Sequence, residues 1–305
     1  MPRVFVIGAA IGRGGAYMAY HVGRIAARRL GGALVNVDVG WRGGTLFAYE
    51  TPMQTLPLDR LEHEIAGDDL LICNPSFSPH MFGLRLSCRK LMYVQDFITF
   101  RYLDCRFDAY VAVSSVVARF LSATYGIDAP VIPAFIDADA CAAFGPPPAA
   151  RRIAVHLKND APEHRAVFEF LKPKIAERCG EVDYLFLSQG RAPHWDFLRQ
   201  LSGAPFLLNI CIAEGFGLVP LEAMAMGRVV AGLDGLGGQD FLRYGQNSLA
   251  VPPAQMERVP ETVERLLADP ALAARLSREA AKTAGAYTRA AFERAWEARL
   301  DAFLA

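Results

Sequence analysis

Two glutamates, Glu214 and Glu222, lie on either side of a glycine-containing turn in the segment CIAEGFGLVPLEAMAMG, residues 211–227. An apolar run leads into the segment and a helical pattern follows the turn, so we expect a strand, a loop and a helix in this order. Gly215 and Gly217 allow backbone amides to approach a ligand closely, and free N–H groups at a helix start bind phosphate oxygens. A carboxylate can also accept hydrogen bonds from two vicinal hydroxyl groups of a ribose. The pattern therefore indicates a site in which one glutamate reaches a sugar and the other a ribose.

The helix of this segment is expected to begin at Pro220, because proline suits the first helical position, where a missing N–H costs nothing. Glu222 then falls in the first turn, where the helix dipole favours a carboxylate, and Gly227 is a natural residue to end the helix. Taken singly, Glu222 is an ordinary first-turn glutamate and Glu214 a surface charge. Their combination with the glycines and the following apolar strand favours a functional pair.

Short apolar runs alternate with segments of helical period along the whole chain. The predicted strands are residues 4–7, 34–37, 70–73, 91–94, 109–113, 153–157, 184–187, 206–211 and 229–231. The predicted helices are residues 17–30, 116–125, 163–178, 261–284 with an interruption near Asp269-Pro270, and 289–304. Continuous apolar strands that alternate with helices are typical of parallel sheets covered on both faces. The predicted fold class is therefore α/β, with doubly wound parallel sheets.

The segment GPPPAA at residues 145–150 interrupts this alternation. It cannot continue a helix or a central strand and is expected to be a stiff connection between domains. We therefore predict an N-terminal domain of residues 1–145, a C-terminal domain of residues 146–288 and a final helical segment of residues 289–305. In such folds ligands bind at the carboxyl ends of the strands, and often between the domains.

The glutamate–seven–glutamate segment resembles the signature of the retaining glycosyltransferases of the large family 4. The similarity continues through GLDGLGGQD at 232–240 and GQNSLAVPP at 245–253 to DPAL at 269–272, and covers most of residues 205–300. Weaker similarity is present in GRGGA at 12–16, FDAYVAVSS at 107–115 and VIPAFID at 131–137. The resemblance implies the GT-B fold of two facing Rossmann-like domains. It also implies that the final helix packs back on the first domain.

This resemblance implies an enzyme that transfers a sugar from a nucleotide diphosphate sugar to an acceptor with retention of configuration. The donor would bind mainly to the C-terminal domain and the acceptor to the N-terminal one. Glu214 would contact the transferred sugar and stabilise the cationic transition state, and Glu222 would hold the ribose. The amides that line the sugar and the diphosphate would be those of Gly215, Phe216, Gly217 and Leu218.

The family needs no metal or other cofactor, because basic side chains and amides offset the charge of the leaving diphosphate. Lys158, after the strand predicted at 153–157, matches the usual arginine position and is the second expected catalytic residue, while Arg165 is the candidate for a second charge. Gly14 and Gly15 resemble the family's glycine-rich loop near the donor phosphates. The segment HLKND at 156–160 lacks the family's glycines.

The stretch between Gly190 and Glu214 is also shorter than usual in the family. In the family this stretch helps to hold the base. The departures at 156–160 and 190–214 therefore leave open which base binds and whether the donor is fully used.

Three residues are candidates for the acceptor side. Gln95 and Asp96 follow the strand predicted at 91–94, where the family often carries His-Asp, and Asp96 could orient an acceptor hydroxyl. A cap at the end of the strand is an equally good interpretation of Asp96. His80, in a predicted loop, is either an acceptor-side residue or a surface histidine. The acceptor itself stays open among glycan, lipid, protein and small molecule.

Composition excludes some classes of partner. The 32 basic residues balance the 32 acidic ones, so no overall field attracts nucleic acid. Arg24, Arg28 and Arg29 form a basic cluster that we interpret as a solvated helix face. The six cysteines show no CxxC pair, which favours a reducing compartment, and the start of the chain lacks a signal-peptide pattern. We therefore expect a cytoplasmic protein, with peripheral membrane contact left open.

Two other functions compete with the transferase. A dinucleotide enzyme is suggested by the glycines at 8, 12, 14 and 15 after the first strand and by Asp38 after the second. The spacing of these glycines differs from the fingerprint, and residues 211–253 would be unexplained. A catalytically silent GT-B module that binds sugars or a partner transferase is suggested by the altered segment around Lys158.

Overall fold

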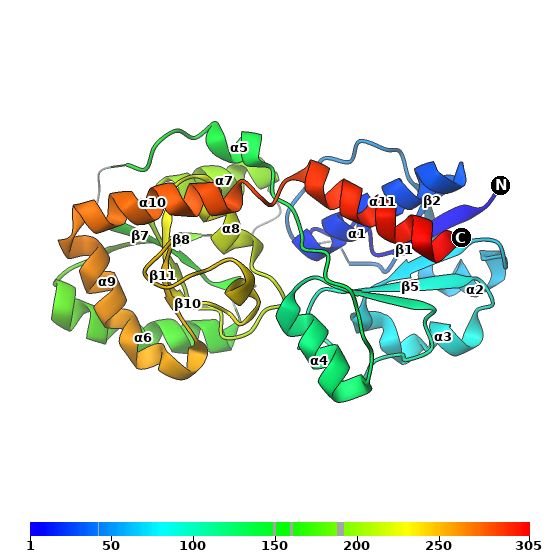
Figure 1. Ribbon diagram of the computed structural model, residues 1–305, viewed down its shortest axis with the longest axis horizontal. Helices are drawn as coiled ribbons and strands as arrows, with labels where there is room; N and C mark the ends of the chain where they lie inside the picture. Colours follow the sequence, from blue (N-terminus) through cyan, green and yellow to red (C-terminus); the bar gives the residue numbers. More distant parts are fainter. Residues whose placement is uncertain (42, 149–150, 159–160, 188–191) are drawn as a thin grey trace. The chain divides into compact units, whose positions relative to one another are not determined.

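The computed structural model describes residues 1–41, 43–148, 151–158, 161–187 and 192–305 (Figure 1). The chain divides into two compact units, one formed by Met1–Phe135 with Arg289–Ala305 and the other by Ile136–Thr288. The division after Phe135 lies ahead of the boundary predicted after residue 145. Helix α5 (Ala138–Ala142) therefore belongs to the second unit. Ala149 and Ala150 of the predicted connection lie outside the described residues.

The first unit contains a six-stranded parallel sheet with the order β3-β2-β1-β4-β5-β6. Its strands are β1 (Arg3–Ile7), β2 (Ala33–Asp38), β3 (Gln54–Pro57), β4 (Leu70–Cys73), β5 (Arg89–Val94) and β6 (Ala109–Ala112). The side chains of β1 and β4 are almost fully buried, as expected for central strands of a sheet covered on both faces. The strand order reverses between β1 and β4, and in folds of this type ligands bind outside the carboxyl ends of the strands at such a point.

Two helices of this unit pack together although they are far apart in the sequence. Helix α1 (Gly14–Leu30) lies beside α11 (Arg289–Leu304), as Figure 1 shows. Ion pairs join Arg24 to Glu293, Arg28 to Glu297 and Arg29 to Asp301. The three arginines are thus a contact surface for α11 rather than a solvated face alone. The remaining helices of the unit are α2 (Leu61–Glu64), α3 (Phe82–Arg85) and α4 (Ser115–Tyr125).

The second unit contains a five-stranded parallel sheet with the order β11-β10-β9-β7-β8. Its strands are β7 (Arg152–His156), β8 (Asp183–Leu187), β9 (Phe206–Asn209), β10 (Val229–Leu233) and β11 (Leu249–Val251). Read in chain order, the first strand of this sheet lies between the second and the third, which is the flavodoxin-like arrangement. The strand order reverses between β7 and β9, so a ligand site is expected at their carboxyl ends.

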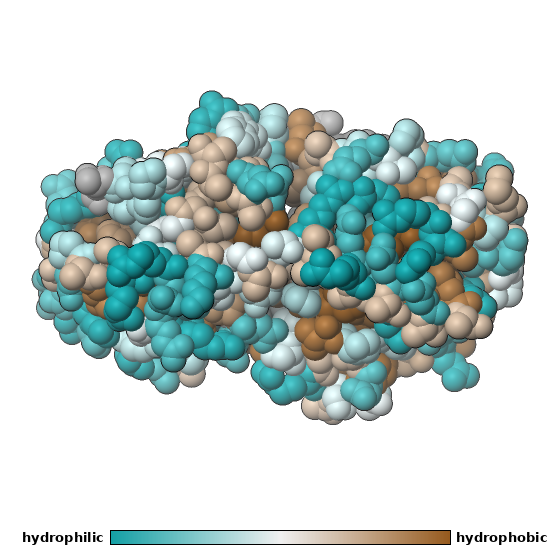
Figure 2. All heavy atoms as spheres, turned by 45° about the horizontal axis from the view of Figure 1, so that its top comes forward, coloured by the Kyte–Doolittle hydropathy of each residue, from teal (hydrophilic) through white to brown (hydrophobic). Residues whose placement is uncertain are grey.

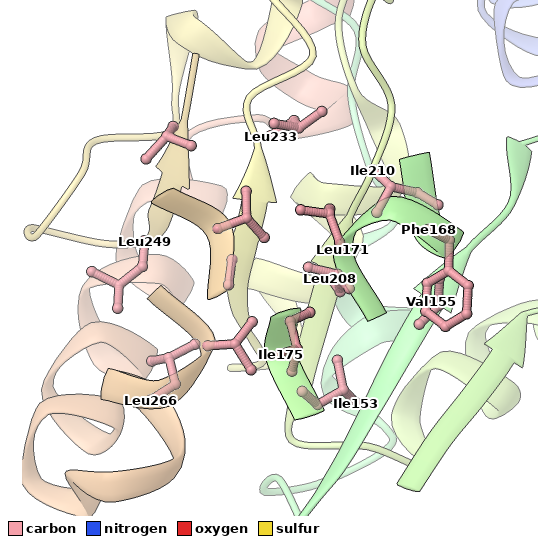
Figure 3. Close-up of a cluster of buried hydrophobic side chains, with 14 of the residues drawn as sticks. Ile153, Val155, Phe168, Leu171, Ile175, Leu208, Ile210, Leu233, Leu249 and Leu266 are labelled. Carbon is pink, nitrogen blue, oxygen red and sulfur yellow. The ribbon is translucent and has the colours of Figure 1, made fainter. Parts of the chain in front are cut away.

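Helices cover both faces of the second sheet. They are α6 (Pro162–Cys179), α7 (His194–Ser202), α8 (Leu218–Ala225), α9 (Val259–Ala268) and α10 (Pro270–Ala284). Figure 3 shows one core, in which Phe168, Leu171 and Ile175 of α6 lie near Leu208 of β9 and Ile210, the residue directly after this strand. Leu266 of α9 closes the same cluster. This apolar cluster fixes the strands whose ends carry the candidate site.

The fold predicted from the sequence is confirmed: two parallel α/β sheets with helices. The short strands β3 and β11 were not predicted, and neither was α7. The predicted interruption at Asp269 is present, where α9 ends and Asp269 caps α10 by accepting from Leu272 N. All six cysteines are free.

Hydrophilic side chains cover much of each unit on the face shown in Figure 2, and hydrophobic residues form small separate patches there. In the described ranges, no helix has both the length and the apolar character required to cross a membrane.

Candidate active site

A lysine and a glutamate meet at the reversal point of the second sheet. Lys158 follows β7 and Glu214 follows the neighbouring strand β9, so both lie at the carboxyl edge of the sheet. Lys158 Nζ lies 3.3 Å from Glu214 Oε2. The Glu214 residue is only 8% exposed, whereas the Lys158 side chain is 33% exposed. A buried carboxylate is thus paired with a cation that still reaches solvent, which is an arrangement suited to an anionic ligand.

The backbone of a second loop fixes Glu214. Its N–H donates to Gly235 O at 2.9 Å, and its carbonyl accepts from Gly237 N at 3.1 Å. The carboxylate lies between Gly217 and Gly235, both with positive φ, where an added Cβ would approach Oε1 to 3.2 and 3.1 Å. Glycine at these positions permits a backbone that other residues adopt only with strain, and it leaves room for the carboxylate. The loop before α8 and the loop after β10 thus both contact Glu214.

The predicted start of the helix is wrong by two residues. Helix α8 begins at Leu218 rather than at Pro220, because Gly217 adopts a left-handed conformation (φ 105°) and caps the helix. Glu222 is therefore the fifth helical residue, and the first turn contains no acidic residue. The helix dipole is therefore not the reason for a glutamate at position 222, because it favours a carboxylate only in the first turn. The predicted end is confirmed, since Gly227 has φ 72° directly after the C-cap residue.

The start of α8 presents a row of amide donors. In the described part of the chain, the N–H groups of Gly215, Phe216, Gly217, Leu218 and Val219 donate to no protein acceptor. The Phe216 side chain is buried beneath them, with its ring 5.4 Å from that of Phe241 and 5.7 Å from that of Tyr287. The cluster of Phe216, Phe241 and Tyr287 holds the loop before α8 in place. Amides without a protein acceptor at a helix start are candidate donors to the oxygens of a phosphate.

Glu222 is held by a histidine that the sequence did not single out. His194, the first residue of α7, donates from Nε2 to Glu222 Oε1 at 2.8 Å. Burial disfavours the imidazolium, but the adjacent Glu222 carboxylate outweighs it, so the pKa of His194 is raised. The Glu222 residue is 6% exposed. The two residues are 28 apart in the sequence, and no helical or strand spacing connects them. Only the packing of α7 against α8 reveals the pair.

A buried arginine ties these two helices together at their other ends. Arg228, only 1% exposed, donates from Nη2 to Ser202 O at the end of α7 and from Nη1 to Met226 O at the end of α8. Nη1 also donates to Gly145 O at 2.8 Å. Burial lowers the pKa of the guanidinium. These bonds supply donors to carbonyl groups that have none within the helices, and they fix the relative positions of α7, which carries His194, and α8, which carries Glu222.

Arg165 is exposed in the first turn of α6, outside the pair that Lys158 forms with Glu214. Two of the departures from the family pattern fall partly on residues outside the described ranges. Asn159 and Asp160 of the altered segment, and Gly190 of the shortened stretch, lie outside the described ranges.

The candidates of the first unit lie at the carboxyl edge of its own sheet. Gln95 Nε2 donates to Gly15 O at 2.8 Å, so the loop after β5 is joined there to the first turn of α1. Gly14 is the first residue of α1. An added Cβ at Gly15 would lie 2.8 Å from Gln95 Oε1, so a larger residue there would displace the end of the Gln95 side chain.

Asp96 and His80 are both engaged locally. Asp96 Oδ1 accepts from Ile98 N, Thr99 N and Thr99 Oγ1 at 3.1, 3.0 and 2.8 Å, which is the geometry of a capped turn. The His80 ring stacks on that of Phe82, with centroids 5.1 Å apart. Each residue thus has a structural role, and a role in acceptor binding stays a prediction. Among the residues described, no three His, Cys, Asp or Glu side chains form a cluster that could hold a metal ion.

Comparison with known proteins adds to this geometry. Residues 195–283 match the family model described as glycosyl transferases group 1. This match covers α7 to α10 and includes Glu214 and Glu222. No curated protein matches the chain.

Solved structures with the same fold are glycosyltransferases of the GT-B type. Sucrose-phosphate synthase from Thermosynechococcus elongatus has 16% identity and a TM-score of 0.68, with 100% of this chain and 99% of that chain covered. A glycosyltransferase from Rickettsia africae has 12% identity and a TM-score of 0.70, with 99% and 98% covered. HepE from Anabaena, solved in complex with UDP, has 13% identity and a TM-score of 0.68, with 99% and 100% covered. The chain therefore has the GT-B fold, as the sequence resemblance predicted.

Proposed function

We propose that this chain is a glycosyltransferase that moves a sugar from a nucleotide diphosphate sugar to an acceptor with retention of configuration. The observation that carries the proposal is the Lys158–Glu214 pair at the reversal point of the second sheet, followed directly by the amides of residues 215–219. The match of residues 195–283 to a glycosyltransferase family model supports the same assignment for the second unit.

Each group of this site has a part in the proposed reaction. The bond between the anomeric carbon and the diphosphate oxygen breaks, the acceptor oxygen forms the new bond to the anomeric carbon, and the proton of the acceptor hydroxyl passes to the leaving diphosphate. Lys158 and the amides of Gly215 to Leu218 stabilise the negative charge on the leaving diphosphate. Glu214 lies at the sugar and stabilises its developing positive charge, and Glu222 binds the ribose.

In this proposal the charge of the leaving group is offset without a metal ion, because a lysine and a row of amides supply the positive potential. Arg165 is proposed as the second cation, and Gly14 and Gly15 as the loop near the donor phosphates. The acceptor is proposed to bind at the carboxyl edge of the first sheet, where Gln95, Asp96 and His80 lie.

A nucleotide panel tests the proposal. UDP is the first candidate because the Anabaena protein was solved with it, and GDP, ADP and dTDP complete the panel. A nucleotide that binds only the folded protein at about 100 times its Kd stabilises it by about 2.7 kcal/mol, which raises the melting temperature. Donor sugars of the stabilising nucleotide are then assayed for hydrolysis and transfer. Failure of all four nucleotides to raise the melting temperature would reject the proposal.

The altered segment around Lys158 favours one alternative, a catalytically silent GT-B module that binds sugars or a partner transferase. Such a module would show no turnover with any donor sugar and acceptor, and nucleoside diphosphates would not raise its melting temperature. Adding NADH to the panel distinguishes a dinucleotide enzyme, because such an enzyme would respond to NADH and to none of the nucleoside diphosphates.

A further inference from the structure

One oxygen of Glu222 is already occupied. Oε1 accepts from His194 Nε2 at 2.8 Å, and the Glu222 side chain is buried in α8. We propose that His194 is a positioning residue for the ribose subsite: it fixes the Glu222 carboxylate so that Oε2 is directed to the ribose 2′-hydroxyl. This inference rests on the proposed function, in which Glu222 binds the ribose.

The position of His194 is rigid. The residue begins α7, directly after Pro193, and its ring is parallel to that of Phe197, with centroids 6.4 Å apart. Phe197 is itself buried. At the other end of α7, Arg228 binds the Ser202 carbonyl and the C-terminal end of α8 together. The imidazole is thus held at a fixed place relative to the helix that carries Glu222.

The charges around the pair favour a cationic histidine. Glu222 faces the ring from α8, and Asp137, the N-cap residue of α5, adds a second negative charge. Cys141 of α5 lies near Glu222, and burial keeps its thiol neutral by raising its pKa. The guanidinium of Arg228 lies near Cys141. Burial opposes the charge on His194, but the two carboxylates raise its pKa, so protonation persists above the usual range.

Protonation determines how firmly the carboxylate is oriented. An imidazolium always donates from Nε2, whereas a neutral imidazole divides between two tautomers, of which one donates there. Loss of the proton therefore leaves Glu222 less well fixed, and discrimination between ribose and 2′-deoxyribose falls. Hydrogen bonds to charged groups are worth about 1.5–3 kcal/mol, which corresponds to a preference of roughly 10- to 100-fold for the 2′-hydroxyl.

The experiment compares the Kd values of UDP and 2′-deoxy-UDP by calorimetry, at about pH 6 and about pH 9; if the panel selects guanine, GDP and 2′-deoxy-GDP take their place. The ratio of the two Kd values cancels the titration of the phosphates, which both nucleotides share. We expect the wild-type ratio to be at least 10 at the lower pH and several-fold smaller at the higher pH. His194→Ala should reduce the ratio to near 1 at both.

His194→Gln separates the hydrogen bond from the charge. Glutamine keeps an N–H donor at the place of Nε2 but does not titrate, so this variant should recover most of the preference and show no dependence on pH. His63→Gln, at an exposed histidine of α2, is the matched control and should leave the ratio unchanged. The melting temperature without nucleotide checks that each variant is folded.

The outcomes separate this inference from the proposed function. If Glu222→Ala abolishes the ribose preference and His194→Ala retains it, His194 does not position Glu222 and the inference is wrong. If the wild-type ratio does not change with pH, the charge of His194 has no role in the ribose preference. The same conclusion follows if the ratio of His194→Gln depends on pH as the wild-type ratio does. If wild-type protein binds no nucleotide of the panel, the proposed function itself fails.

Discussion

Lys158 and Glu214 are 56 residues apart in the sequence, and their side chains meet at 3.3 Å. Lys158 follows β7 and Glu214 follows β9, the two neighbouring strands between which the order of the second sheet reverses. The pairing is thus a consequence of topology, because parallel neighbours present their carboxyl ends at the same edge.

Replacing Glu214 with glutamine should reduce transfer by roughly 100-fold or more, because the side chain can no longer offset positive charge on the sugar. The shape of the side chain is kept, so the melting temperature shift with UDP should remain. Steady-state kinetics with the sugar of the stabilising nucleotide measure the effect. Unchanged turnover in Glu214→Gln would remove this residue from catalysis.

Lys158→Ala should lower kcat by about 10- to 1,000-fold, since it removes the cation beside the leaving diphosphate and leaves Glu214 buried without its partner. Lys158→Arg should recover part of the activity, because it restores the charge. Lys172→Ala, on α6 and exposed, is a matched loss of one positive charge and should leave kcat as it is. Equal effects of the two alanine variants would show that only overall charge matters.

Arg228→Met should destabilise the second unit by about 2–4 kcal/mol, because three carbonyl groups lose their donor inside the fold. Denaturant unfolding measures this change. Arg199→Met removes an exposed guanidinium that pairs with Asp196, and it should change stability by less than about 1 kcal/mol. A loss as small as that of the control would mean that water replaces the Arg228 contacts.

His21 should make the protein less stable in acid. The residue is fully buried against the rings of Tyr17 and Phe135, and neither ring nitrogen has a hydrogen-bond partner in the described structure. Burial, reinforced by Arg289 and Arg24, lowers its pKa from 6.5 to about 3. The unfolded chain therefore binds a proton between these values while the folded chain does not, so stability falls as pH falls below 6.5.

The test measures, as a function of pH, the difference in the free energy of unfolding between wild type and His21→Phe. From pH 6.5 to about pH 5, wild type should lose about 2 kcal/mol relative to the variant, at about 1.4 kcal/mol per pH unit. Glu50, whose pKa is lowered to about 2 by Arg289, begins to lose its contribution only below 4.5 and does not disturb this window. Parallel pH curves for the two proteins would contradict the assignment. His194 has a raised pKa and the opposite sign, but it is present in both.

Sequence patterns predicted the parts of this molecule that depend on local periodicity. The buried strands, the helix over 289–304 and the glycine that ends α8 follow from apolar spacing and turn chemistry. The start of α8 was missed because Gly217 caps the helix, which therefore begins at Leu218, before the proline that usually marks a first turn. Here a backbone conformation, which the residue type permits but does not dictate, decided the boundary.

The candidate site was predicted in part for the same reason. Glu214, Glu222 and the loop between them are contiguous, so one segment of sequence contains them. His194 and Arg228 act on Glu222 through the packing of α7 and α8, and no spacing in the sequence encodes that contact. Such residues become visible only when the tertiary structure brings the helices together.

The ion pairs between α1 and α11 have a consequence for the order in which the protein is made. All of Ile136–Thr288 lies between the two sections of the first unit, so a ribosome must complete the second unit before it reaches α11. At roughly 5–20 residues per second, Arg24, Arg28 and Arg29 are synthesised many seconds before their acidic partners. Tyr93 is likewise synthesised well before Trp296, against which its ring packs. The unit whose synthesis starts first is therefore the last to complete its core, and its nascent surface is the one that a chaperone would meet.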